Sequence, residues 1–174
     1  METRETLFKK IDQLGKKHKN YCPLLFTHGH LGTTNQKAYC CVAKGSDEYD
    51  KSTFGEWWNS EKFNQDRKNI LSTNSEKAQI PECTTCWTQE KNNTLSYRQQ
   101  AIDLLRDDET SNEMIIELIE NVQATLDGKP LPHKPQYFDI RFGNLCNLKC
   151  PTCNPGSSSQ VYKEIKNNTK LYDT

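Results

Sequence analysis

Residues 138–153 read FDIRFGNLCNLKCPTC, and they join a strand pattern to a loop of three cysteines. From Tyr137 to Phe142 apolar and polar residues alternate, which predicts a β-strand. Cys146, Cys150 and Cys153 follow at spacings of four and three, and a helix is predicted over residues 157–166. A cysteine loop between a strand and a helix is typical of a functional site.

Three thiolates this close in sequence can hold one inorganic centre. A 4Fe-4S cluster with only three cysteine ligands keeps one iron open for another group, as catalytic metal sites do. A structural zinc ion needs a fourth protein ligand, and no Cys or His follows Cys153. The spacing therefore favours a reactive iron–sulfur site.

Together with residues 155–160 (PGSSSQ), this stretch resembles the first strand and cluster loop of the radical S-adenosylmethionine (radical SAM) enzymes. The resemblance implies that Cys146, Cys150 and Cys153 hold a 4Fe-4S cluster whose fourth iron binds S-adenosylmethionine. It implies reductive cleavage to a 5′-deoxyadenosyl radical, with a reductant such as flavodoxin or ferredoxin. Thr152 departs from the family, which usually has a bulky residue there, near the adenine.

The N-terminal half carries a second set of cysteines. Cys22, Cys40 and the close pair of Cys83 and Cys86 supply four thiolates, the donor set of a tetrahedral zinc site or of another 4Fe-4S cluster. Spacing alone does not separate these two. Adjacent cysteines point in different directions on an extended chain, so only one of Cys40 and Cys41 is an easy ligand to the same centre. We favour Cys40, with Cys41 as the alternative.

Two histidines are alternative ligands for this second set. His28 and His30 lie between its first two cysteines, and either imidazole can replace a thiolate. A structural histidine is the more common case, so we expect both to be structural.

The second set also carries a resemblance. Residues 21–28 (YCPLLFTH), the Asn35-x4-Cys40-Cys41 turn, residues 54–60 (FGEWWNS) and Cys83-x2-Cys86 together resemble the twitch module, a shortened relative of the SPASM domain. The resemblance covers roughly residues 20–100 and implies an auxiliary 4Fe-4S cluster. It raises peptides as a substrate class. Asn35 stands where the family commonly has Gly, and Asn also tolerates such a turn.

The predicted fold class is α+β. We expect an N-terminal helix in residues 1–20, a small metal-stabilised twitch/SPASM-like module in 21–100, a helical connector with a Pro-rich linker in 101–135, and the beginning of a partial (β/α) radical SAM barrel in 136–174. The family's core has roughly 200 residues on the usual βα pattern. We therefore expect a fragment, a truncated frame or half of a split enzyme that a second chain completes, with no efficient catalysis alone.

Local signals place the elements. Leu7, Ile11 and Leu14 predict a helix over residues 4–18, and residues 21–42 are typical of short strands joined by turns. Capping boxes predict three more helix starts. In each, a Ser or Thr precedes a Glu or Gln by three residues: Thr53 and Glu56, for one helix running toward Leu71; Ser96 and Gln99; and Thr110 and Glu113.

Composition limits the function. The 23 basic and 23 acidic residues balance, so nothing indicates a nucleic-acid partner. No apolar run is long enough for a membrane span, and the N-terminus lacks a signal peptide, so the expected location is the cytoplasm. In a reducing compartment the eight cysteines favour metal over disulfides. A non-catalytic iron–sulfur electron carrier and a zinc-stabilised interaction module remain the alternatives.

Overall fold

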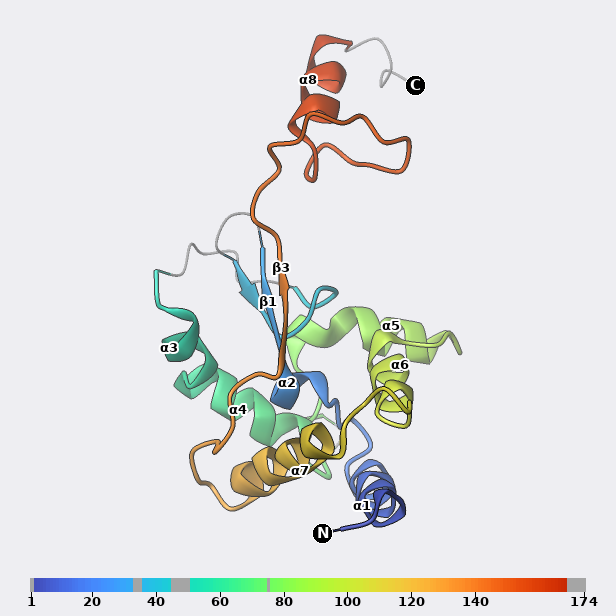
Figure 1. Cartoon of the computed structure of the whole chain (residues 1–174), viewed down its shortest axis with the longest axis vertical. Coiled ribbons are helices and arrows are strands. Elements are labelled where there is room, and N and C mark those ends of the chain that lie inside the picture. Colours follow the sequence, from blue (N-terminus) through green and yellow to red (C-terminus); the bar gives the residue numbers. More distant parts are fainter. Residues whose placement is uncertain (1, 33–35, 45–50, 75, 169–174) are drawn as a thin grey trace.

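The computed structural model describes residues 2–32, 36–44, 51–74 and 76–168. It has the predicted mixed α+β composition, with helices packed beside a small three-stranded sheet (Figure 1). None of the helices in these ranges is both long and apolar enough to cross a membrane. Asn35, on which the expected turn depends, lies outside the described residues.

The core is built on two amphipathic helices, α1 (Arg4–Lys17) and α7 (Asn112–Leu126). Leu7 and Ile11, one turn apart on α1, are buried where α1 contacts α7. Gly128 ends α7 with a φ of 71°, a conformation that Gly adopts without strain. Both helices confirm the periodicity of the sequence, although the predicted cap of α7 is wrong by one residue, because Ser111 accepts the capping hydrogen bond.

The single helix predicted from Thr53 is wrong, because the structure has two. The capping box of Thr53 and Glu56 is confirmed and starts α3 (Phe54–Trp58). Ser60 then accepts a hydrogen bond from the third backbone N–H after it and starts a new helix, α4 (Glu61–Ile70). A serine in this position satisfies an otherwise unpaired donor, which favours a fresh helix start over continuation.

Arg67 on α4 joins three helices from inside the core. Its guanidinium is fully buried and donates hydrogen bonds to the carbonyl of Leu25 (2.9 Å) and the carbonyl of Trp58 (2.7 Å). It also lies over the ring of Phe63, 3.7 Å from the centroid. Burial lowers the pKa of Arg67 to about 9. The planar guanidinium of Arg67 therefore fixes α4 against the segments around Leu25 and Trp58.

We expect Arg67→Lys to lower the free energy of unfolding by about 2 kcal/mol, because a lysine keeps the charge but leaves a buried carbonyl unpaired. Urea unfolding measures this. The exposed neighbour Lys68 provides the control, since Lys68→Ala should change stability by less than about 0.5 kcal/mol. Equal effects of the two substitutions would contradict the role given to Arg67.

The expectation of short strands and turns over residues 21–42 is wrong for residues 24–27, which are helical. Pro23, with a φ of −63°, leads into the short helix α2 (Leu24–Thr27), and the Thr27 hydroxyl donates to the Pro23 carbonyl (3.0 Å). All of α2 is buried, and it contacts α7. A helical turn pairs its backbone locally, which suits a segment buried between helices.

The sheet brings distant segments together. Its order is β2-β1-β3, with β1 (His28–Leu31) antiparallel to β2 (Lys37–Ala38) and parallel to β3 (Tyr137–Ile140). β3 confirms the strand expected after the Pro-rich segment. Because β3 pairs with β1, the sheet crosses the boundary predicted at residue 136, and the division into module and core stays a prediction.

Three further helices carry or flank cysteines. The 3₁₀ helix η1 (Pro81–Cys83) runs directly into α5 (Thr84–Lys91). The predicted capping box of Ser96 and Gln99 is confirmed and starts α6 (Tyr97–Leu104).

The chain after β3 forms a C-terminal arm, residues 141–168, that ends in α8 (Ser159–Asn167) and extends away from the helical body (Figure 1). No residue of α8 is buried. Phe142 and Leu145 are 96% and 92% exposed. The arm therefore leaves apolar side chains uncovered.

Candidate metal centres

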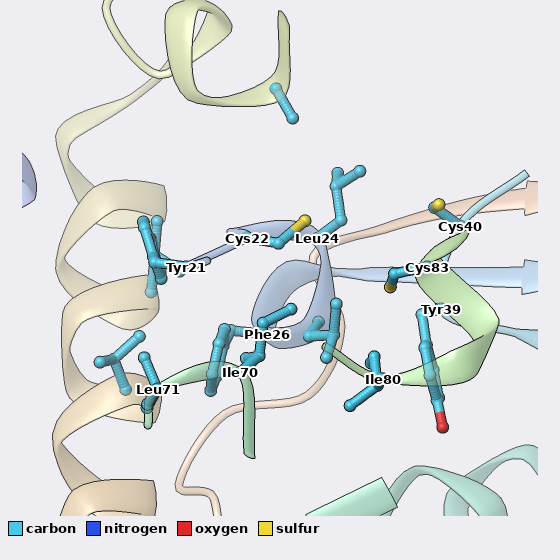
Figure 2. Packing of buried hydrophobic residues seen from close by; sticks show 14 of the residues in the cluster. Tyr21, Cys22, Leu24, Phe26, Tyr39, Cys40, Ile70, Leu71, Ile80 and Cys83 are labelled. Atoms are coloured by element: carbon cyan, nitrogen blue, oxygen red, sulfur yellow. The ribbon is translucent and has the colours of Figure 1, made fainter. Parts of the chain in front are cut away.

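Cys22, Cys40, Cys83 and Cys86 line one small cavity in the core. All four are buried free thiols. Figure 2 shows three of them, Cys22, Cys40 and Cys83, on separate segments around the same part of the core. The four cysteines that spacing alone joined are thus neighbours in space.

Short elements position these cysteines. Cys22 stands two residues before α2, and Cys40 follows β2. Cys83 ends η1, and Cys86 lies in the first turn of α5. A backbone hydrogen bond from Lys44 to the Glu82 carbonyl (2.9 Å) fastens the Cys40 segment to the Cys83 segment.

A polar network strengthens the same link. The Tyr39 hydroxyl donates to Asp66, while the Lys62 ammonium donates to Asp66 (2.7 Å) and Glu82 (2.5 Å). Burial lowers the pKa of Lys62, but these carboxylate hydrogen bonds outweigh it and raise the pKa above its ordinary value. Tyr39 and Glu82 each directly precede a cavity cysteine, so the network holds two of the four in place.

Burial favours the protonated form of three of these thiols, those of Cys22, Cys40 and Cys83, because it raises their pKa. It raises the pKa of Cys40 to about 11 and that of Cys22 and Cys83 further, and neighbouring thiols add to the rise for Cys22 and Cys83. A metal ion would therefore displace protons on binding, as thiolate sites require.

The donor chemistry fits a soft metal. Four thiolates suit zinc or an iron–sulfur cluster. The cavity measures about 10 Å³, the space of roughly one water molecule. Within the described residues, no three or more Cys, His, Asp or Glu side chains already form a coordination shell, so the thiols would have to draw closer around a metal. The cavity has room for a single ion around which the thiols would close, whereas a cluster needs the walls to move apart.

The neighbouring Cys41 is not among the cavity residues. Its side chain is in hydrogen-bonding contact with Tyr97, whose hydroxyl also contacts Tyr137. Burial, followed by these two contacts, raises the pKa of Tyr97. Of the adjacent pair, the structure thus places Cys40 in the cavity.

The two alternative histidine ligands lie elsewhere. His28 stacks on Tyr137, with 4.3 Å between ring centroids. The Nδ1 atom of His30 lies 3.0 Å from a carboxylate oxygen of Asp139. Neither histidine lines the cysteine cavity.

His28 makes stability depend on pH. Burial lowers its pKa from 6.5 to about 4, with His30 acting in the same direction and Asp139 opposing both. The unfolded chain takes up this proton below pH 6.5 and the folded chain only near pH 4, so stability falls as pH decreases through that window. We expect a loss on the order of 2–3 kcal/mol.

Urea unfolding of the wild type and His28→Phe between pH 7.5 and 4 tests this. Phe keeps an aromatic ring beside Tyr137 but does not titrate, so the variant should lose less stability on acidification. Parallel pH profiles for the two proteins would exclude His28 as the source.

The other three cysteines lie on the loop of the C-terminal arm. Cys150 is exposed, whereas Cys146 and Cys153 are half-buried. The loop turns back through a hydrogen bond from the Cys153 amide to the Cys150 carbonyl (2.9 Å). The Leu148 amide donates to the Cys146 sulfur (3.4 Å).

The start of α8 anchors this loop. Ser158 is fully buried, caps α8 and donates through its hydroxyl to the Leu148 carbonyl (3.1 Å). The Ser159 hydroxyl accepts from the Cys146 amide (3.3 Å), and the Ser159 amide donates to the Asn144 carbonyl (2.7 Å). The loop is thus fixed at its base, and of its three thiols only that of Cys150 is exposed.

A polar cleft of about 690 Å³ lies beside the loop. Its walls include His30 of β1, Arg141 and Gly143 after β3, and Asn154 and Ser157 from the end of the cysteine loop. It lies where the parallel strands β1 and β3 end, which is the usual ligand position in parallel sheets. None of the three cysteines lines this cleft, and within the described part of the chain they do not yet stand close enough together to hold a metal ion. Three thiolates drawn together there would leave one position of a centre open for a ligand.

Sequence reasoning did not find the contacts that hold the four-cysteine cavity. The Tyr39–Asp66–Lys62–Glu82 network joins residues far apart in the chain, and no local pattern signals it. The buried Arg98 beside the cavity was missed for the same reason. No family model matches the chain, and comparisons with curated proteins and with solved structures also give no match.

Proposed function

We propose that this chain is the N-terminal part of a radical SAM enzyme with an auxiliary thiolate metal centre. The main support for this proposal is the loop of three cysteines between β3 and α8. The loop lies beside a polar cleft at the ends of the parallel strands β1 and β3. A 4Fe-4S cluster bound there would pass one electron, taken from a reductant, to S-adenosylmethionine, which would then cleave into methionine and a 5′-deoxyadenosyl radical. Cys146, Cys150 and Cys153 would hold three of its irons.

The chain's own residues prepare the site. Ser158 and Ser159 hold the base of the loop, at Cys146 and Leu148, against α8. The exposed side of the loop leaves access for a reductant such as flavodoxin or ferredoxin. A peptide substrate follows from the twitch resemblance alone, by analogy.

The uncovered arm supports the expectation that further polypeptide completes the core. Phe142, Leu145 and Leu148 are exposed, and α8 has no buried residue. Exposed apolar clusters of this kind mark surfaces that another segment or chain covers. The eight free thiols fit a reducing compartment such as the cytoplasm.

Metal analysis tests the proposal. After anaerobic reconstitution, two four-iron clusters give about eight irons and about eight sulfides per chain. Cys146, Cys150 and Cys153 replaced together by alanine should leave about four of each. The proposal is excluded if the triple variant keeps the full iron content of the wild type.

One observation favours a second candidate, a zinc-stabilised module in place of the auxiliary cluster. The cavity of about 10 Å³ suits one ion better than a cluster. In that case the protein purified anaerobically contains about one zinc and, after reconstitution, about four irons. Colourless protein that takes up zinc and no iron would replace the radical SAM proposal with an interaction module.

A further inference from the structure

Arg98, the second residue of α6, lies at the wall of the four-cysteine cavity. It is 8% exposed. Among the residues lining the cavity it is the single cationic side chain, and none of them is a carboxylate. A buried cation is costly unless it is paired, so its partners explain how it is held there.

Glu90 and a backbone carbonyl hold the guanidinium. Arg98 donates to both oxygens of Glu90, at 2.9 Å from Nε and 2.6 Å from Nη2. Its Nη1 donates to the Tyr21 carbonyl (3.0 Å). The Ser96 hydroxyl also donates to Glu90 (2.6 Å). Paired hydrogen bonds of this type fix an arginine in one orientation.

These contacts join both halves of the thiol set. Tyr21 directly precedes Cys22, whereas Glu90 lies on α5, one turn after Cys86. Arg98 therefore fastens the first cysteine segment to the helix that carries the last. Arg98 lines the cavity and Glu90 does not, so the arginine is the member of the pair that lies next to the thiols.

The position of Arg98 matters because a metal centre bound by four thiolates is negatively charged. Four thiolates around a divalent ion carry a net charge of about −2, and so do four thiolates around an oxidised 4Fe-4S cluster. In a buried site such a charge is stabilised by a nearby cation. Glu90 neutralises much of the guanidinium charge, so the Arg98–Glu90 ion pair stabilises the anionic centre less than an unpaired cation would.

We infer that Arg98 is a positioning residue for the four-thiol centre, which holds the Cys22 segment against α5 and places positive charge at the edge of the bound metal. This inference rests on the proposed auxiliary centre and applies to zinc and to a cluster alike. Loss of an outer partner typically weakens metal affinity 10- to 100-fold.

Cobalt(II) titration tests the inference, because thiolate-to-cobalt absorption reports ligation directly. Arg98→Gln should weaken cobalt affinity by about 10- to 100-fold in competition with a chelator, while the absorption at saturation stays that of four thiolates. Arg98→Lys keeps the positive charge but loses the paired N–H donors of the guanidinium, so it should recover part of the cobalt affinity that Arg98→Gln loses. The control is Arg106→Gln, eight residues further on and partly exposed, which should bind like the wild type.

The outcomes separate the two claims. If the wild type shows no thiolate-to-cobalt absorption, the four-thiol centre is excluded, and the role of Arg98 is excluded with it. If the wild type binds cobalt and the cobalt affinity of Arg98→Gln is within twofold of the wild-type value, only the role of Arg98 is excluded. Equal weakening by Gln and Lys would overturn the charge component and leave the paired hydrogen bonds as the only contribution.

Discussion

Cys83→Ser should remove the metal from the four-thiol centre and lower the free energy of unfolding by about 4 kcal/mol at a metal concentration about 1,000 times the dissociation constant. Cys83 is one of four thiols that line the cavity, and it holds the turn into α5. Metal binding and folding are coupled in such sites, so both quantities fall together. Urea unfolding and metal analysis of the same preparation measure them.

Cys41→Ser is the matched control, because Cys41 adjoins a cavity cysteine but does not line the cavity. This variant should keep its metal and most of its stability. Unchanged metal content and unchanged unfolding in Cys83→Ser would contradict the assignment of the cavity as a metal centre.

Cys150→Ala should abolish the iron–sulfur signal that responds to S-adenosylmethionine and reduce reconstituted iron by about four atoms. Cys150 is exposed on the arm, so its loss should change the free energy of unfolding by less than about 0.5 kcal/mol. Electron paramagnetic resonance with and without the cofactor checks the signal. The combination of lost signal and retained stability distinguishes a site residue from a structural one.

Thr152→Ala is the control for the loop, because Thr152 lies between two of the three cysteines and offers no thiolate. It should keep the responsive signal. If Cys150→Ala also keeps that signal, the reactive centre lies on another set of cysteines.

The elements that sequence predicted best are those decided by local chemistry. The apolar spacing of Leu7 and Ile11 gave α1, and two capping boxes gave the starts of α3 and α6. Such signals depend on residues three or four apart, which form the same contacts in most surroundings. Ser60 carried a similar local signal for the start of α4, and it was missed.

The parts that sequence did not predict depend on distant residues. α2 is helical because it is buried among other helices, and β3 pairs with β1 across more than a hundred residues. The four thiols that the sequence predicted as one set do line one cavity, but Lys62 and Arg98, which hold their segments in place, act through partners far along the chain. Propensity and periodicity do not encode such pairings.

The most direct test of the radical SAM proposal is electron–nuclear double resonance on the reconstituted, reduced protein with S-adenosylmethionine labelled with ¹⁵N at its amino group. An open iron in a cluster held by Cys146, Cys150 and Cys153 predicts hyperfine coupling between that nitrogen and the cluster. The coupling should be absent in Cys150→Ala and present in Thr152→Ala. A cluster signal that shows no nitrogen coupling and does not change on addition of the cofactor would contradict the proposal.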